Sequence, residues 1–210
     1  MSVQTQVDVG GILRPQGRLT ADPLARYNGA LDERSAAHLL RRAGFGGSDS
    51  EIKRYSAMSV DAAVESLVRF PSTASLPEPV DVFDPRVVLG RYRPQDYRAL
   101  DKVTKKGIEQ GLREQNQASV RSMQVWWLNR MLATPAPLQE KMAFYFSGHF
   151  TSAAGQKAVA ATLTYQQNQL FRNYALGNLR ELTRAVSQDP AMLIYLDNAS
   201  NVASHPNENF

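Results

Sequence analysis

The sequence contains no cysteine and only three histidines among its 210 residues. Without cysteine, the chain has no disulfide framework, no thiolate metal site and no cysteine nucleophile. The histidines, His38, His149 and His205, do not follow a metal-ligand spacing, so we expect no metal site built on them. Because proteins that lack cysteine occur on either side of a membrane, this absence does not assign a compartment.

Long apolar runs are also missing from the sequence. Residues 1–30 lack the apolar core of a signal peptide, and no stretch approaches the length of a membrane span. We expect residues 1–30 to form an extended or disordered arm. The sequence has no phosphate loop, dinucleotide-binding glycine fingerprint, HExxH or GxSxG motif, so it identifies no cofactor.

The charge balance is mild, since 24 lysines and arginines against 20 aspartates and glutamates give a net charge of +4. The basic side chains of Lys105, Lys106 and Arg113 alternate with acidic ones, so no continuous basic face is expected and we predict no nucleic-acid partner. With 43% hydrophobic and 21% charged residues, the chain has the composition of a globular protein with a core.

Apolar spacing of three and four residues recurs along the chain, and it predicts an all-α fold. We expect an irregular orthogonal array of at least six helices in a single domain over residues 31–210, truncated at its C-terminus, with a proline-rich connector over residues 70–94. The predicted helix N-caps are Ser48, Ser59, Asn178 and Asp189, and Gly44 is predicted to end a helix as a left-handed cap.

Several details of these helices are predicted from the same pattern. Residues 97–132 are expected to form one long helix or a broken pair, weakened by Gly107 and Gly111. Val103 and Leu179 are expected on apolar stripes of their helices, and Tyr145 on a buried stripe. The mostly charged segment 101–117, which contains Val103, is expected to be partly exposed. In a truncated chain, we expect Met192, Leu193 and Leu196 to be insufficiently covered.

One candidate for chemistry is His149, which follows an aromatic run in the segment AFYFSGHF. A ring held there would be partly desolvated, which suits either a general base or a core histidine bonded to a carbonyl.

A second candidate is the polar tail behind the last helix. Its side-chain amides and carboxylates are Asp197, Asn198, Asn201, Asn207, Glu208 and Asn209.

The tail residues have two interpretations. Asp197 and Glu208 are a candidate carboxylate pair for acid and base chemistry, or oxygen ligands for a hard cation such as calcium, although the spacing is unlike an EF-hand loop. The four asparagines are candidate substrate-binding residues, or each caps a turn. We predict that His149 and the segment from Asp197 to Asn209 form one site, with His149, Asp197 and Glu208 as its catalytic residues.

Three segments resemble the bacterial domain-of-unknown-function 1800 family: LLRRAGFG at 39–46, EKMAFYFSGHF at 140–150, and the block from Phe171 through the PNEN motif. The resemblance covers residues 31–210, and members usually continue into a long C-terminal portion. It implies export, and genes that often neighbour those of a sulfatase-like family, but no agreed activity. Two features differ from the family pattern, because this sequence lacks a second histidine before His149 and lacks the usual export signal.

The family pattern falls on a defined set of residues in this chain. They are Arg41, Gly44, Phe45, Gly46, Glu140, His149, Phe150, Asp189, Pro190, Asp197, Asn198, Asn201, Pro206, Asn207, Glu208 and Asn209.

The sequence is consistent with two alternative functions. One is an exported hydrolase-like enzyme acting on an extracytoplasmic polymer through a polar His/Asp/Glu cleft. The other is a non-catalytic scaffold or binding partner of a sulfatase-like protein, in which the same residues are caps.

Overall fold

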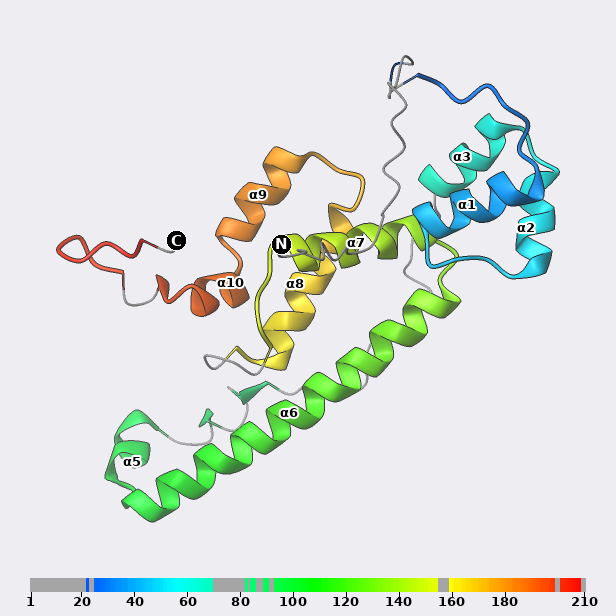
Figure 1. The fold of residues 1–210 in the computed structure, drawn as a ribbon. Coiled ribbons are helices and arrows are strands. Elements are labelled where there is room, and N and C mark those ends of the chain that lie inside the picture. Colours follow the sequence, from blue (N-terminus) through cyan, green and yellow to red (C-terminus); the bar gives the residue numbers. More distant parts are fainter. Residues whose placement is uncertain are drawn as a thin grey trace, which may run out of the picture.

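The computed structural model describes residues 22, 25–69, 82, 84–85, 89–90, 93–154, 159–198 and 201–208. Within these ranges the chain forms nine helices and no sheet, which confirms the all-α prediction (Figure 1). The helices are α1 (Glu33–Ala43), α2 (Asp49–Ser56), α3 (Val60–Val68), α5 (Pro94–Ala99), α6 (Lys102–Ala133), α7 (Pro137–His149), α8 (Ala161–Asn173), α9 (Leu179–Ser187) and α10 (Pro190–Tyr195). Most of the predicted arm and connector lies outside the described residues, and the single-domain boundaries stay a prediction.

Helices α1, α2 and α3 gather at one end of the molecule (Figure 1). Their shared core contains Leu40 of α1, Tyr55 of α2 and Leu67 of α3. Local chemistry starts the second and third helices as predicted. Ser48 and Glu51 form a reciprocal capping box, and the Ser59 hydroxyl accepts from the N–H of Ala62 at 3.2 Å.

The prediction for Gly44 is wrong in its mechanism. Gly44 ends α1 in an extended conformation, with φ −152° and ψ −146°, and the left-handed glycine is Gly46, at φ 110°. Glycine is needed at position 44 for space, because a Cβ there would lie 2.9 Å from Cβ of Pro137 and 3.2 Å from the carbonyl oxygen of Leu40. The end of α1 therefore packs directly on the start of α7.

Helix α6 is the long element of the fold, with 32 residues. It runs unbroken through Gly107 and Gly111, and the break from α5 falls instead at Leu100 and Asp101. The Asp101 carboxylate caps α6 by accepting from the N–H groups of Val103 and Thr104 at 2.8 and 2.9 Å. At 1.5 Å per residue the helix is about 48 Å long.

The N-terminal end of α6, beside α5, lies away from α7 and α8 (Figure 1). Val103 is therefore 81% exposed, in agreement with the expected partial exposure of segment 101–117. A sequence pattern can mark an apolar stripe on a helix, but burial requires another element opposite it. Across its C-terminal half, α6 packs on α7 and α8, where Met123 is buried.

A second core joins α7, α8, α9 and α10. It contains Phe146, Phe171, Leu182, Val186 and Met192, with Leu196 packed partly against it. Asn178 and Asp189 cap α9 and α10 as predicted. The expectation that Met192 would be poorly covered is wrong, because this side chain is only 7% exposed.

The predicted buried position of Tyr145 is wrong, and Leu179, expected on an apolar stripe of its helix, is also exposed. Tyr145 is 57% exposed and Leu179 is 61% exposed. Leu179 is the first residue of α9, where it precedes the buried pair Leu182 and Val186. On α7, the side facing α8 is formed by polar and small residues, Gln139, Glu140 and Ala143, together with Phe146.

None of the helices that the structure describes is long and apolar enough to cross a membrane.

Candidate functional site

His149 is the last residue of α7, and its side chain is exposed rather than partly desolvated as predicted. Aromatic contacts at the surface hold the ring. It stacks on Tyr145 with ring centroids 5.9 Å apart and an interplanar angle of 11°, and it meets Phe150 edge-on at 4.8 Å. His149 is therefore an exposed residue whose ring packs against two neighbouring aromatic side chains.

The two predicted catalytic carboxylates, Asp197 and Glu208, are both exposed. Asp197 follows α10 with φ 56°, which makes it the one described non-glycine residue in the left-handed region. Aspartate tolerates this conformation better than most residues, and such conformations recur at functional sites. The approach of these carboxylates to His149 stays a prediction.

Three of the four predicted substrate-binding asparagines bond to the protein itself. The Asn201 side-chain amide donates to Oδ1 of Asn198 at 3.2 Å, and Oδ1 of Asn201 accepts from the N–H of Asn207 at 2.9 Å. The Asn207 amide donates to the carbonyl oxygen of Leu196. Asn209 lies outside the described residues. These amides build the turns that follow α10, as the structural interpretation of the tail expects.

The described residues offer no metal site of the usual kind. In the ranges given above, no group of three or more histidines, aspartates and glutamates is arranged to hold a metal ion. The calcium interpretation of Asp197 and Glu208 would therefore need ligands of other types, such as carbonyl oxygens.

Sequence reasoning gave no role to Glu140, whose carboxylate is completely buried between α6, α7 and α8. Its Oε1 accepts from Nε of Arg130 at 2.6 Å and from Nε of Arg172 at 2.7 Å. Its Oε2 accepts from Nη2 of Arg172 at 3.0 Å and from Nε1 of Trp127 at 3.1 Å. We call these four residues the buried ion cluster.

The buried ion cluster carries two guanidinium charges and one carboxylate charge. The excess positive charge is met by neutral acceptors, since Arg172 donates to Oδ1 of Asn168 at 2.7 Å and to Oε1 of Gln169 at 2.6 Å. Both guanidinium groups also lie near the ring of Trp126, at 5.6 and 5.5 Å from its centroid. The cluster thus has a net charge of +1, and neutral acceptors and an aromatic ring surround its cations.

Burial raises the pKa of Glu140, but the hydrogen bonds and charges of Arg172 and Arg130 outweigh it, so the net pKa lies below its ordinary value. An ionised carboxylate with all its acceptor positions occupied is a poor general base. The contacts of the cluster join α6, α7 and α8. The feature of the sequence that could have indicated this cluster is a glutamate on the inward side of α7, one turn before Ala143.

Asp189 lies at the centre of a smaller buried polar group. Its Oδ2 accepts from the N–H of Met192 at 3.0 Å and from the Gln167 amide at 2.8 Å, and Gln167 accepts from the Ser152 hydroxyl. Burial raises the pKa of Asp189, and the hydrogen bonds from Met192 and Gln167 offset this only in part. This group joins α8 to the start of α10.

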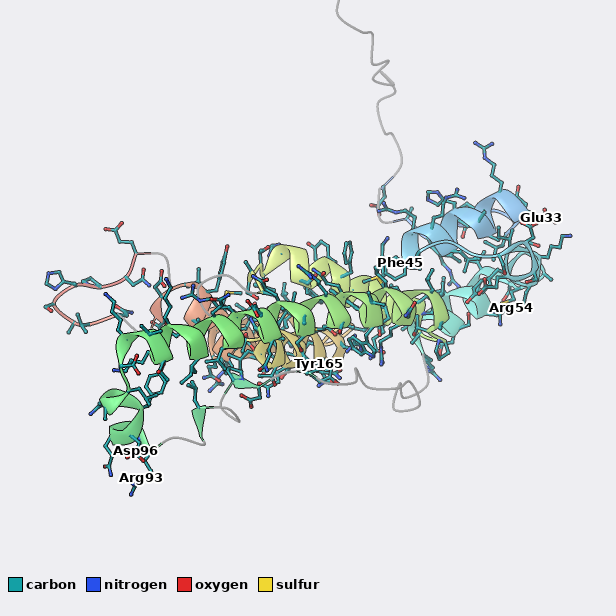
Figure 2. The ribbon with its side chains drawn as sticks, turned by 90° about the horizontal axis from the view of Figure 1, so that it is seen from below. Glu33, Phe45, Arg54, Arg93, Asp96 and Tyr165 are labelled. Carbon is teal, nitrogen blue, oxygen red and sulfur yellow. The ribbon has the colours of Figure 1, made fainter. Side chains whose placement is uncertain are left out.

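Large apolar side chains gather where the α1–α2 turn meets α6 and α7, a place marked by the label of Phe45 in Figure 2. The ring of Phe144 lies 6.4 Å from that of Phe45 and 6.0 Å from that of Trp127. Leu128 and Leu132 continue the apolar side chains along α6. We call these five residues, Phe45, Trp127, Leu128, Leu132 and Phe144, the aromatic surface.

The aromatic surface borders a cleft of about 440 Å³ between the α1–α2 turn and the α6–α7 turn. Phe45 and Leu132 line the cleft, together with Tyr55 and Met131. Basic groups stand at its rim. The Lys141 ammonium lies 5.0 Å from the centroid of the Phe45 ring, and Arg54, labelled in Figure 2, lines the cleft. The sequence analysis did not identify this surface, because its parts are far apart in the chain.

Comparison with known protein families identifies a match. A family model described as "Protein of unknown function (DUF1800)" matches residues 38–210, which is most of the chain. No curated protein matches, and no solved structure matches. The match includes the second half of α1, the buried ion cluster and the polar tail.

Proposed function

Because this chain belongs to the DUF1800 family, for which no activity is described, we propose its function from its own surfaces: it is a non-catalytic module that binds a partner protein. The binding site in this proposal is the aromatic surface. The partner that the family resemblance suggests is a sulfatase-like protein, since genes for such proteins often neighbour those of the family.

The observation that carries this proposal is the exposure of large apolar side chains in one place. Phe45 is 40% exposed, Phe144 52%, Leu128 60% and Leu132 83%. Contiguous apolar surface of this kind, rimmed by charge, is typical of a protein interface. Aromatic residues and arginine, both present here, are enriched in protein interfaces.

The rigidity of the aromatic surface supports the same function. Trp127 links the surface to the interior, since its ring contacts Phe144 while its Nε1 donates to buried Glu140. A side chain that is fixed before binding loses little conformational entropy in the complex. Through Trp127, the buried ion cluster therefore helps to hold the aromatic surface in position.

The test is direct binding to a purified sulfatase-like protein of the kind encoded beside family members, measured by isothermal titration calorimetry. We expect Leu132→Ala and Phe144→Ala each to weaken the affinity about tenfold, equivalent to about 1.4 kcal/mol. The matched control is Leu179→Ala on α9, which removes a similarly exposed leucine outside the aromatic surface and should leave the affinity unchanged.

Two results would contradict the proposal. One is no binding by the wild-type chain at concentrations where interfaces of this kind are occupied. The other is an equal loss of affinity in the Leu132→Ala and Leu179→Ala variants, which would move the interface away from the aromatic surface.

A second candidate function, favoured by the left-handed backbone of Asp197, is an exported hydrolase-like enzyme acting on an extracytoplasmic polymer. In this proposal His149 transfers a proton, Asp197 and Glu208 supply the carboxylates, and Asn198, Asn201, Asn207 and Asn209 hold substrate hydroxyl groups.

The hydrolase proposal is tested by release of soluble fragments from cell-wall polysaccharide. His149→Ala, Asp197→Asn and Glu208→Gln should each abolish the release, while Glu181→Gln on α9 should not. Fragment release that persists in the three variants would contradict this assignment of the catalytic residues.

A further inference from the structure

A second cleft lies on the module formed by α1, α2 and α3, and no function proposed above uses it. Its volume is about 800 Å³. Residues of α1, the first residues of α3 and the segment before α1 line it: Tyr27, Leu31, Asp32, Arg34, Ser35, His38, Leu39, Arg41, Arg42, Val60 and Val64. We call it the α1–α3 cleft.

One side of the α1–α3 cleft is basic. Arg34, His38 and Arg41 follow a spacing of four and three residues, so they lie in one row along α1, and Arg42 adjoins that row. In the described part of the chain, no ion pair within 4.0 Å engages Arg34, Arg41 or Arg42. Three exposed guanidinium groups therefore face solvent beside an open cleft.

Acidic groups nearby offset only part of the charge of this row. The Asp32 carboxylate caps α1 by accepting from the N–H of Ser35 at 2.7 Å, and its charge also interacts with that of Arg34. On α3, Asp61 is paired with Arg26. The lining of the cleft has three arginines and one carboxylate, so it keeps an excess of positive charge.

The other side of the cleft is apolar. Val60 and Val64 lie one turn apart on α3, and Val64 is 43% exposed. Leu39 of α1 and the buried Leu31 complete the apolar lining. A ligand that fills the cleft would therefore meet guanidinium groups along one edge and branched aliphatic side chains along the other.

We propose that the α1–α3 cleft binds an acidic amphipathic helix of a partner protein. Arg34 and Arg41 are separated by two turns of α1, about 10 Å along the helix axis. A partner helix with acidic residues at i, i+4 and i+7 repeats this spacing, and its apolar face meets Val60 and Val64. Binding of an amphipathic helix in a groove through such anchors is a common mode of peptide recognition.

The apolar edge favours a peptide over a nucleic acid or an anionic membrane. A phosphate backbone has no apolar face to place against Val60 and Val64, and nucleic-acid affinity comes mainly from continuous positive charge. The α1–α3 cleft shares no residue with the aromatic surface, so this proposal is independent of the proposed function.

The test uses the 210-residue chain and a fluorescent peptide of about fifteen residues, long enough to form a helix, with glutamates on one face and leucines on the other. Anisotropy measures its binding. A scrambled peptide of the same composition controls for net charge alone. We expect the amphipathic peptide to bind about tenfold more tightly than the scrambled one, with an affinity that falls as salt is added.

Two sets of variants separate the two edges of the cleft. The double variant Arg34→Gln and Arg41→Gln should weaken binding about tenfold, and Val64→Ser should weaken it about fivefold. The matched control is Arg180→Gln with Arg184→Gln, which removes the same charge from an exposed pair on α9 and should leave binding unchanged. Far-ultraviolet circular dichroism checks that each variant retains its helices.

Three results would overturn the proposal. One is equal binding of the amphipathic and scrambled peptides. Another is equal weakening by the α1 and α9 double variants, because charge alone would then explain the affinity. The third is tighter binding to a DNA duplex or to phosphatidylglycerol vesicles, lost in the α1 double variant but kept in Val64→Ser, which would assign the basic row to a phosphate surface instead.

Discussion

Replacing Glu140 by glutamine tests the central contact of the fold. The substitution keeps the volume of the side chain, so it creates no cavity, but it leaves two buried guanidinium groups without a carboxylate. Glu140 accepts four hydrogen bonds, from Trp127, Arg130 and twice from Arg172. Removing one partner of a buried ion pair costs about 3–5 kcal/mol. We expect Glu140→Gln to lower the free energy of unfolding by this amount.

The assay is urea denaturation followed by far-ultraviolet circular dichroism. The matched control is Glu65→Gln, because Glu65 pairs with Arg69 at the surface, where the two side chains are 53% and 82% exposed. An exposed pair of this kind contributes about 0–1 kcal/mol. If the two variants lowered the free energy of unfolding equally, burial of the ion cluster would not matter to stability and the reasoning would be refuted.

The acid sensitivity of the same variant gives an independent measurement. Because the arginines hold the pKa of Glu140 below the ordinary value of 4.5, the unfolded chain takes up a proton at this position before the native chain does. The stabilisation is complete above that ordinary value and is lost as the pH falls through the native pKa. Glu140→Gln should therefore flatten the fall in stability at acid pH, whereas Glu65→Gln should not.

Two further substitutions test local features of the fold. Gly44→Ala should destabilise the chain by about 1–3 kcal/mol, because its Cβ would press on Pro137. Gly107→Ala should stabilise the chain by about 0.5–1 kcal/mol, because Gly107 lies within α6 and the space around a new Cβ is open there. Thermal unfolding measures both changes. Burial raises the pKa of Asp189, so the native chain binds a proton at this carboxylate more tightly than the unfolded chain does. The stabilisation from this group therefore falls as the pH rises above 3.8 through the native pKa. Asp189→Asn should remove this fall, as measured by urea denaturation at a series of pH values; an unchanged pH dependence would show that Asp189 is not its source.

The helix boundaries were largely predictable from the sequence, because the signals are local. Ser48, Ser59, Asn178 and Asp189 each cap a helix within three residues of their own position. Capping depends on a side chain and the N–H groups just after it, and both are visible in a short stretch of sequence. The same holds for Pro137 in the first turn of α7.

Burial was less predictable, because it depends on which elements meet. Val103, Tyr145 and Leu179 have apolar spacing but face solvent, while Glu140 is charged and fully buried. The two arginine partners of Glu140 lie 10 and 32 residues away in the chain, so no local sequence pattern predicts these contacts. The candidate site shows the same limit, since the turns built by Asn198, Asn201 and Asn207 follow from local chemistry, whereas their approach to His149 is a long-range prediction.

The unequal chain separations within the buried ion cluster also have a consequence for the order of folding. Arg130 is 10 residues from Glu140, and Arg172 is 32 residues from it. Closing the longer loop costs about 1 kcal/mol more in chain entropy than closing the shorter one. We therefore expect α6 and α7 to form a hairpin around a neutral Arg130–Glu140 pair, onto which α8 docks later with the second guanidinium. On the ribosome the same order is enforced, since Glu140 emerges before Arg172 has been synthesised.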